Sequence, residues 1–403
     1  MVYKFKLFNY IFLYFAALFI ILDCYSVWHN TLATEFTVTA VILSIILSIP
    51  SILNLLRRNG KYIFAFLFLY FATMILFYYF NAMSDNKTFI LKYFIWLPLM
   101  VNYFYYGDSI KKMKDFFLAI ENIMLYISII SLFFYIFGTL LGWFQPTSTI
   151  NINWGHFTQY NSYFGIYFEG HIVEIAGIMV TRNIGIFIEG PMFSFCLCIA
   201  LYIELFINKS TGKWRILLLI ITTITVLSTT GLISIVLLLL LKYIQRQGKG
   251  LTFQKLSLSI IIPLVASIGI YLIAQKINTG SGMIRADDLQ AGYNAWLNNK
   301  LFGVGIDNVS GINPYKQISW RQDYGTSMGV VKAMAEGGVV LVLVYVLPFI
   351  FALKNIIKNK NFTIIGGFII MFELVFSTIV CYKLLVLLCV SMMWAYTLKY
   401  IRT

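Results

Sequence analysis

Arg182 and Glu189 lie in the segment Arg-Asn-Ile-Gly-Ile-Phe-Ile-Glu-Gly-Pro, where a polar stretch enters an apolar run. An ionised side chain in hydrocarbon costs at least about 2.5–3.5 kcal/mol, so it persists where a cavity, a partner or a substrate stabilises it. A guanidinium suits phosphate oxygens, and a partly desolvated carboxylate suits proton transfer because its pKa rises. A helical path would place Glu189 two turns from Arg182. We therefore expect a functional site at this segment.

A second candidate pair, Arg285 and Asp288, follows the sequence Ser-Gly-Met-Ile in a later polar stretch. Four apolar residues nearby recur at helical spacing, which predicts an amphipathic helix on the membrane surface: Ile284, Leu289, Tyr293 and Trp296. Arg285 and Asp288 would share the polar side of that helix. They are either substrate contacts or an ion pair three residues apart, which would contribute only tenths of a kcal/mol.

Aromatic side chains alternate with amides in the first long polar stretch, residues 143–184, and include Trp154 beside His156. Aromatic faces stack on the C–H faces of sugar rings, and neighbouring polar groups bond to the hydroxyls. This pattern predicts sugar binding by Trp154 and His156. The alternative is an aromatic belt at the membrane interface.

The composition requires elements that cross a membrane: 60% of residues are hydrophobic, 11% are charged and the mean hydropathy is +0.83. A helix needs about 20 apolar residues to cross a bilayer, and about twelve such stretches recur along the chain. We expect an all-α polytopic membrane protein with about twelve transmembrane helices. The stretches cover 7–27, 36–56, 62–80, 88–106, 116–142, 185–207, 216–227, 231–243, 254–275, 329–352, 362–381 and 384–399.

Basic residues predict the orientation, because cytoplasmic loops retain Lys and Arg. They fall on one side if the run between Arg215 and Lys242 is a hairpin of two short helices rather than one long tilted helix. Both termini are then cytoplasmic, and two large loops lie outside the cytoplasm. The predicted organisation is five helices in 1–142, a loop in 143–184, helices six to nine in 185–275, a loop with the amphipathic helix in 276–328, and three helices in 329–403.

The formal charge of +14 is read as a topology signal rather than a sign of nucleic-acid binding. The five cysteines lie in or beside apolar runs, and the three histidines lack ligand-like spacing. Neither a disulfide framework nor a metal site is predicted. We expect no cofactor.

Together these features resemble the O-antigen and capsular polysaccharide polymerase (Wzy-like) and O-antigen ligase superfamily of bacterial membrane proteins. The resemblance rests on the Arg182–Pro191 segment, on Leu-Ser-Thr-Thr-Gly at 227–231, and on a second large loop that ends in the pair Gly303 and Gly305. The ligases resemble one another in a histidine near the end of that loop. Thr326 stands at the corresponding position, which favours a polymerase over a ligase.

The resemblance implies a glycosyltransferase that joins polyprenyl-diphosphate-linked oligosaccharide repeat units, without a metal, at the outer face of the bacterial plasma membrane. Its partners would be these lipid-linked sugars, membrane lipid, a chain-length regulator and a flippase. Arg182 and then Arg285 would stabilise the departing diphosphate. Glu189 would be the general base, or would instead orient Arg182.

The remaining predicted substrate contacts are Asn183, Asp288, Asp323, Tyr324, Trp154 and His156. Two alternative functions share some of these features. One is an O-antigen-type ligase, which uses the same donor. The other is a lipid-linked oligosaccharide flippase or transporter, although the related halves and long central connection that a two-repeat carrier should show are missing from the sequence.

Overall fold

The computed structural model is 74% helical and contains five helices long and apolar enough to cross a membrane among the residues it describes. This is the fold of a helical membrane protein. The five helices span His29–Arg57, Lys61–Phe80, Lys114–Leu140, Gly190–Ile207 and Gly329–Phe351. The structure describes residues 2–57, 60–106, 109–154, 156–175, 178–208, 212–246, 280–318, 326–359, 365–367, 370–371, 375 and 378–402. The predicted span 254–275 lies outside these residues.

The N-terminal part of the chain is a series of apolar helices. They are α1 (Val2–Asp23), α2 (His29–Arg57), α3 (Lys61–Phe80), α4 (Asn86–Phe89), α5 (Leu97–Tyr106) and α6 (Ser109–Phe134). Two π-helical segments continue this series: η1 (Ile90–Trp96) joins α4 to α5, and η2 (Tyr135–Leu140) extends α6. The predicted span 88–106 is therefore three short elements rather than one regular helix.

The all-α prediction is wrong for the first long polar stretch, which forms two small sheets. An antiparallel sheet has the order β1-β2-β3, and β4 pairs with β5 in a second hairpin. The strands are β1 (Ser148–Trp154), β2 (His156–Tyr163), β3 (Tyr167–Glu169), β4 (Ile172–Ile175) and β5 (Ile178–Thr181). Successive side chains of a strand point to opposite faces of its sheet. Ile152, Tyr160 and Phe168 form a buried cluster on one face, and the side chains next to them in sequence point to the other face.

The next helix, α7 (Gly190–Tyr202), begins five residues later than the predicted span at 185. Pro191 occupies its first turn, where a proline is well tolerated. The preceding residues use their backbone groups elsewhere: Val27 N donates to Ile186 O at 2.9 Å, and Ile188 N donates to Tyr25 O at 3.0 Å. Glu189 therefore stands at the N-cap position, directly before α7, instead of lying two turns inside a helix.

The apolar run 216–243 is broken into two helices, α8 (Lys213–Thr225) and α9 (Thr229–Arg246), and both pack on α7. Leu227 in the break has a positive φ of 53°, which an uninterrupted helix would not contain. This confirms the prediction of two short helices. The other elements of the described residues are η3 (Ile203–Ile207), α11 (Gly280–Asn298), α12 (Val309–Ile312), η4 (Asn313–Tyr315), α13 (Gly329–Asn359) and α15 (Leu384–Arg402).

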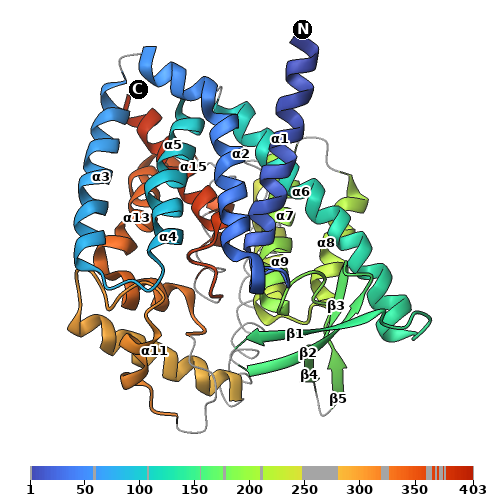
Figure 1. Cartoon of the computed structure of the whole chain (residues 1–403). Coiled ribbons are helices and arrows are strands. Elements are labelled where there is room, and N and C mark those ends of the chain that lie inside the picture. The colour runs from blue at the N-terminus through green and yellow to red at the C-terminus, as the bar shows by residue number, and fades with distance from the viewer. Residues whose placement is uncertain are drawn as a thin grey trace, which may run out of the picture.

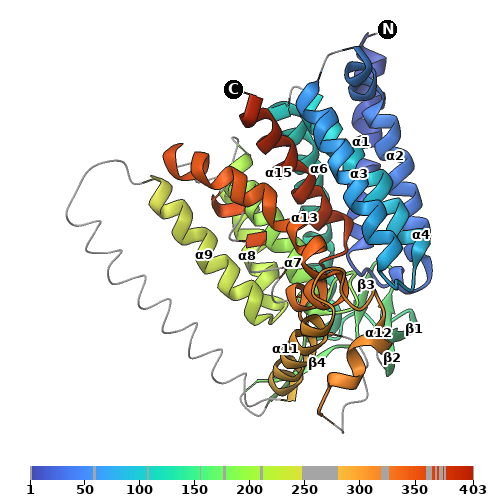
Figure 2. The ribbon, with the colours of Figure 1, turned by 90° about the vertical axis from the view of Figure 1, so that its left-hand side faces the viewer.

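The chain termini lie at one end of the helix bundle, and the strands lie at the other. Figure 1 shows both chain termini at one end, and α11 and all five strands at the opposite end, which we call the loop end. The turned view in Figure 2 keeps this division, with α11 below α13 and the strands beside it. Large buried side chains such as Trp96, Phe104 and Phe193 form one main hydrophobic core between the helices.

Candidate functional site

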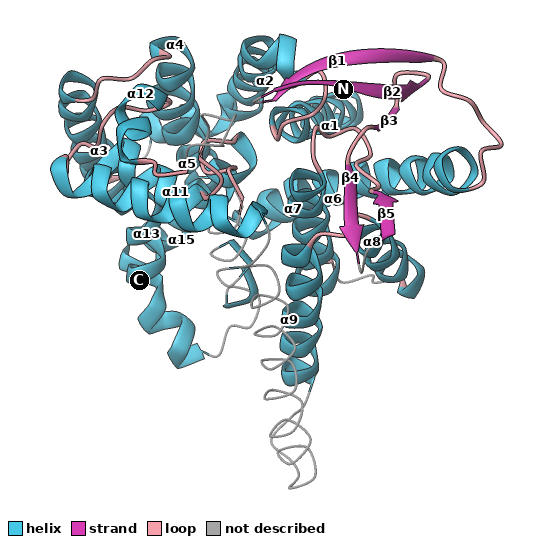
Figure 3. Ribbon diagram, turned by 90° about the horizontal axis from the view of Figure 1, so that it is seen from below, coloured by secondary structure: helices cyan, strands magenta, loops and turns pink. Residues whose placement is uncertain are grey.

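Arg182, Glu189 and Arg285 come from three different elements and meet at the loop end. Seen from that end, α11 and the strands lie on either side of α7 (Figure 3). Arg182 follows β5, Glu189 precedes α7 and Arg285 lies in α11. A Cβ placed on Gly190 would lie 3.4 Å from Cδ of Arg182, so the arginine packs against the start of α7. The pair predicted from sequence is therefore close together through a turn rather than a helix.

The electrostatics of this first charge cluster tie the three side chains together. Burial lowers the pKa of Arg182, and the charge of Glu189 opposes that shift while Arg285 adds to it. Burial likewise lowers the pKa of Arg285, and the negative charges of Glu189 and Asp288 oppose that shift. Arginine stays protonated despite such shifts, so the site holds two partly buried cations. Nε of Arg182 is buried without a hydrogen-bond partner in the described part of the chain.

The segment between the two predicted catalytic residues is held rigidly by backbone hydrogen bonds. Arg182 N donates to His171 O at 2.9 Å, and Phe168 N donates to Gly185 O at 2.9 Å. Gly185 adopts a positive φ of 57°, which turns the chain back toward α7 and favours glycine. Tyr160 of β2 donates its hydroxyl to Ile188 O at 2.9 Å. These contacts fix the position of Arg182 relative to Glu189.

Asn183 is fully buried and bonds to protein groups on both sides. Its side-chain Nδ2 donates to Thr225 Oγ1 at 3.0 Å and its Oδ1 accepts from Gly185 N at 3.1 Å. Its backbone N also donates to Thr225 O at 3.1 Å. The structure thus places Asn183 where it anchors the 182–189 segment to the end of α8.

The face of α11 that carries Asp287 and Asp288 turns inward. Both carboxylates are buried. Asp288 accepts a hydrogen bond from Ser327 N at 2.6 Å, and Asp287 accepts one from Gln317 N at 2.8 Å. The opposite face exposes Leu289 and Tyr293, which agrees with a helix whose outer side is apolar.

The other predicted substrate contacts fall in two places. Trp154 and His156 are paired residues at the tip of the β1–β2 hairpin. Asp323 and Tyr324 lie outside the described residues. Of the predicted site residues, Arg182, Glu189, Arg285 and Asp288 therefore interact with one another. For Trp154 and His156, the structure describes only the backbone.

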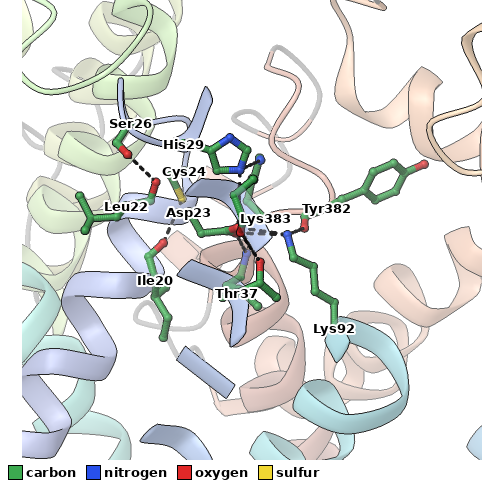
Figure 4. Close-up of polar contacts among 12 residues, drawn as sticks. Ile20, Leu22, Asp23, Cys24, Ser26, His29, Thr37, Lys92, Tyr382 and Lys383 are labelled. Atoms are coloured by element: carbon green, nitrogen blue, oxygen red, sulfur yellow. Dashed lines mark hydrogen bonds and ion pairs between the residues drawn. The ribbon is translucent and has the colours of Figure 1, made fainter. Parts of the chain in front are cut away.

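A second charge cluster, absent from the predicted site, surrounds the buried carboxylate of Asp23 at the end of α1 (Figure 4). Lys92 Nζ lies 3.1 Å from Asp23 Oδ1, and the backbone N of Leu384 donates to Oδ2 at 2.7 Å. His29 Nε2 lies 3.8 Å from Oδ1, and Thr37 donates its hydroxyl at 3.4 Å. One carboxylate thereby joins α1, α2, η1 and the start of α15.

Lys383 lies beside this carboxylate and bonds to His29 rather than to an acid. Its Nζ is 2.8 Å from His29 Nε2 and 3.4 Å from the centre of the Tyr25 ring. Burial lowers the pKa of the Lys383 amine to about 7, although the charge of Asp23 opposes the shift. Lys383 thus titrates near neutrality, several units below an ordinary lysine.

A cavity of about 180 Å³ adjoins this cluster. Asp307 lines it and is paired with Lys332 of α13 at 2.6 Å. Burial raises the pKa of Asp307, but the Lys332 ammonium outweighs that effect and holds the pKa below its usual range. Lys332 Nζ also lies 3.8 Å from Oε1 of Glu336, four residues further along α13, so Lys332 contacts two carboxylates.

The sequence did contain a signal for this second cluster. Asp23, Lys92 and Lys383 are ionisable residues in or beside apolar runs, which is the default mark of a functional or paired group in a membrane. They were missed as a set because they lie far apart in the chain. Tyr25 links the two clusters, since its carbonyl accepts from Ile188 N and its ring contacts Lys383.

No protein-family model, curated protein or solved structure matches this chain. Within the described ranges, no group of three or more His, Cys, Asp or Glu side chains is arranged to hold a metal ion.

Proposed function

We propose that this protein is a polysaccharide polymerase that joins polyprenyl-diphosphate-linked oligosaccharide repeat units by glycosyl transfer. The observation that carries the proposal is the electrostatic interaction of both Arg182 and Arg285 with Glu189 at the loop end. Two guanidinium groups from separate elements suit a diphosphate, because each makes bidentate and always charged contacts with phosphate oxygens. Nε of Arg182, which is buried and has no hydrogen-bond partner among the described residues, supplies a donor for such a ligand.

The proposed chemistry needs little beyond positioning and charge stabilisation. The diphosphate is already an activated leaving group, so preorganised cations that meet its developing charge lower the barrier directly. Arg182 and Arg285 take this role. Glu189 has two candidate roles: it accepts the proton of the attacking hydroxyl, or it orients the two arginines. The reaction is proposed to proceed without a metal ion.

An apolar cavity supports a lipid-linked substrate. It has a volume of about 180 Å³ and is lined by α13, by α15 and by residues just before α15, including Val330, Val346 and Val390. Tyr345 lines this cavity, and its hydroxyl lies 2.7 Å from that of Tyr93, which lines the charged cavity. A polar and an apolar cavity on opposite sides of one tyrosine pair suit an amphiphile with a polar sugar part and an isoprenoid tail.

The finer membrane topology belongs to the same proposal. We propose about twelve transmembrane helices in a bacterial plasma membrane, cytoplasmic termini, and large outer loops at 143–184 and 276–328. The shared position of the termini, opposite the strands and α11, supports this orientation. The exposed Leu289 and Tyr293 of α11 would then rest against the outer membrane surface. The protein partners proposed are a flippase and a chain-length regulator.

The test is to incubate the purified protein with polyprenyl-diphosphate-linked repeat units and to separate the lipid-linked products by size. We expect a ladder that rises in whole repeat units and persists in excess chelator. Arg182→Lys keeps the charge but loses the planar fork, so it should lower the rate by about 10²-fold, similar to the loss of one transition-state donor. Arg182→Ala should lower the rate further. Glu189→Gln removes the negative charge of the carboxylate and so tests whether the reaction requires it.

The matched control is Lys300→Ala, which removes an exposed cation at the end of α11 and should leave the ladder unchanged. Unchanged single units from folded wild-type protein would contradict the polymerase proposal. Transfer of one glycan to a separate acceptor would instead indicate a ligase. Movement of the intact lipid across vesicles, with no new glycosidic bond, would indicate a flippase.

A further inference from the structure

The charged cavity beside Asp23 has a lining suited to a sugar. Four aromatic residues and three threonines contribute to its wall: Tyr25, Phe89, Tyr93, Tyr382, Thr34, Thr37 and Thr88. Aromatic faces stack on sugar rings and hydroxyls exchange hydrogen bonds with theirs. The cavity volume of about 180 Å³ accommodates one sugar ring rather than a whole repeat unit.

The cavity also contains a nitrogen pair able to take up a proton. Lys383 Nζ and His29 Nε2 lie 2.8 Å apart in a hydrogen bond. Such a bond needs a lone pair on one of the two nitrogens, so the pair cannot hold all of its protons while the bond exists. Asp23 is already committed to Lys92 and to Leu384 N, and Asp307 is committed to Lys332. These carboxylates are therefore less available as bases.

The position of the cavity relative to the arginines suits a transfer between two bound substrates. Tyr25 borders both sites: its ring contacts Lys383, and its carbonyl accepts a hydrogen bond from Ile188, the residue before Glu189. A donor held by Arg182 and Arg285 and an acceptor held in the cavity would meet at this tyrosine.

From this geometry we infer that the cavity binds the acceptor sugar and that Lys383, held by its hydrogen bond to His29, takes the proton of its attacking hydroxyl. The inference rests on the proposed function. The hydroxyl oxygen bonds to the anomeric carbon of the donor, and the bond from that carbon to the diphosphate breaks. The electron pair leaves with the diphosphate toward the arginines, and the hydroxyl proton moves to the Lys383 amine. Glu189 is then left to orient the arginines.

The charges around Lys383 determine the expected pH dependence. Asp23 faces it from the end of α1, Cys24 and Tyr25 from the connection to α2, and His29 from the first residue of α2. Lys92 faces it from η1 and Asp307 from the loop before α12. Burial outweighs the acidic neighbours and lowers the pKa of Lys383 to about 7. A base must be unprotonated to act, so the rate should rise as pH increases through about 7.

The experiment compares the ladder rate of wild type with that of Lys383→Arg across this pH range. Arginine keeps a cation but remains protonated, so we expect a loss of at least about 100-fold at every pH. Lys87→Arg, the same exchange at an exposed position of the loop end, is the control. Binding of the lipid-linked donor to Lys383→Arg should remain unchanged, because the donor site contains other residues.

A second readout needs neither a variant nor activity. Competitive acetylation of the wild-type protein, followed by mass spectrometry, reports the protonation of each lysine. We expect Lys383 to reach half of its limiting reactivity near pH 7 and Lys87 near the ordinary lysine value of about 10.4.

Three outcomes would overturn the inference. If Lys383→Arg retains the wild-type rate within about threefold, or if Lys383 stays protonated up to its ordinary pKa, then Lys383 is not the proton acceptor and the polymerase proposal survives. If the wild-type protein forms no ladder, then the proposed function fails and the acceptor role fails with it.

Discussion

At the scale of single residues, the Asp23 carboxylate contacts Lys92, His29, Thr37 and the backbone N of Leu384. Its contribution can be tested by measuring the stability of a variant. Asp23→Asn leaves Lys92 buried without its counter-charge. Breaking one partner of a buried ion pair typically costs about 3–5 kcal/mol, because an uncompensated charge remains. We expect the thermal unfolding midpoint of Asp23→Asn in detergent to fall clearly below that of the wild type.

The control for this prediction is Asp85→Asn, also at the loop end. Asp85 is exposed and accepts a hydrogen bond from Thr88 N as the N-cap of α4, a role that asparagine fills equally well. Its unfolding midpoint should match the wild type. Equal midpoints for both variants would show that Asp23 does not stabilise the bundle.

At the scale of elements, each π-helical segment carries a polar side chain used in a contact. Lys92 lies in η1, Thr139 in η2 and Glu204 in η3. Thr139 donates to Glu169 at 2.9 Å, and Glu204 pairs with Arg215 at 3.3 Å. A π turn changes the direction of side chains relative to a regular helix and often occurs at functional positions. The π-helical segments therefore direct these three polar side chains toward their partners, whereas a regular helix would point them in another direction.

The break in α13 at Gly338 depends on a close approach of the 300–305 loop. Gly338 has a φ of 60° and Gly303 a φ of 72°. A Cβ on Gly303 would overlap the backbone of Glu336, whose carbonyl accepts from Gly305 N at 3.1 Å. The loop thus satisfies carbonyls that the break frees, and it places Asp307 beside Lys332.

We predict that Gly303→Ala destabilises the protein far more than Gly142→Ala. Both glycines have a positive φ, which costs a residue with a Cβ about 1–2 kcal/mol, but only Gly303 is crowded, since nothing lies within 4 Å of a Cβ at Gly142. Thermal unfolding of the two variants measures the difference. Similar losses would show that the loop does not depend on this close approach.

At the scale of the whole molecule, the proposed orientation predicts which surfaces face the outside of the cell. The five native cysteines are buried, so background labelling by a membrane-impermeant maleimide should be low. Lys300→Cys lies at the loop end and Lys213→Cys at the start of α8, and both positions are exposed. We expect labelling of Lys300→Cys in intact cells, and of Lys213→Cys only after permeabilisation. The reverse pattern would invert the proposed topology.

Much of the architecture follows from local sequence patterns. Apolar length alone predicted the helices at 62–80 and 329–352, which α3 and α13 match closely, because a bilayer sets the length of what crosses it. The distribution of basic residues favoured two short helices over one long helix between Arg215 and Lys242, and α8 and α9 are two helices. The strands at 148–181 were missed because many aromatic residues read as sugar contacts, such as Tyr160 and Phe168, are the buried core of the sheet region.

The sequence by itself determined the class of this protein, a helical membrane protein, and the presence of ionisable residues at the margins of its apolar runs. Periodicity and hydrophobic length are local properties, so they are readable along the chain. Only the tertiary structure decided which of those residues meet. Asp23, Lys92 and Lys383 form one cluster, and Arg182 meets Arg285, because helix packing brings distant segments to one end. A buried charge requires partners, but their identity depends on how the helices assemble.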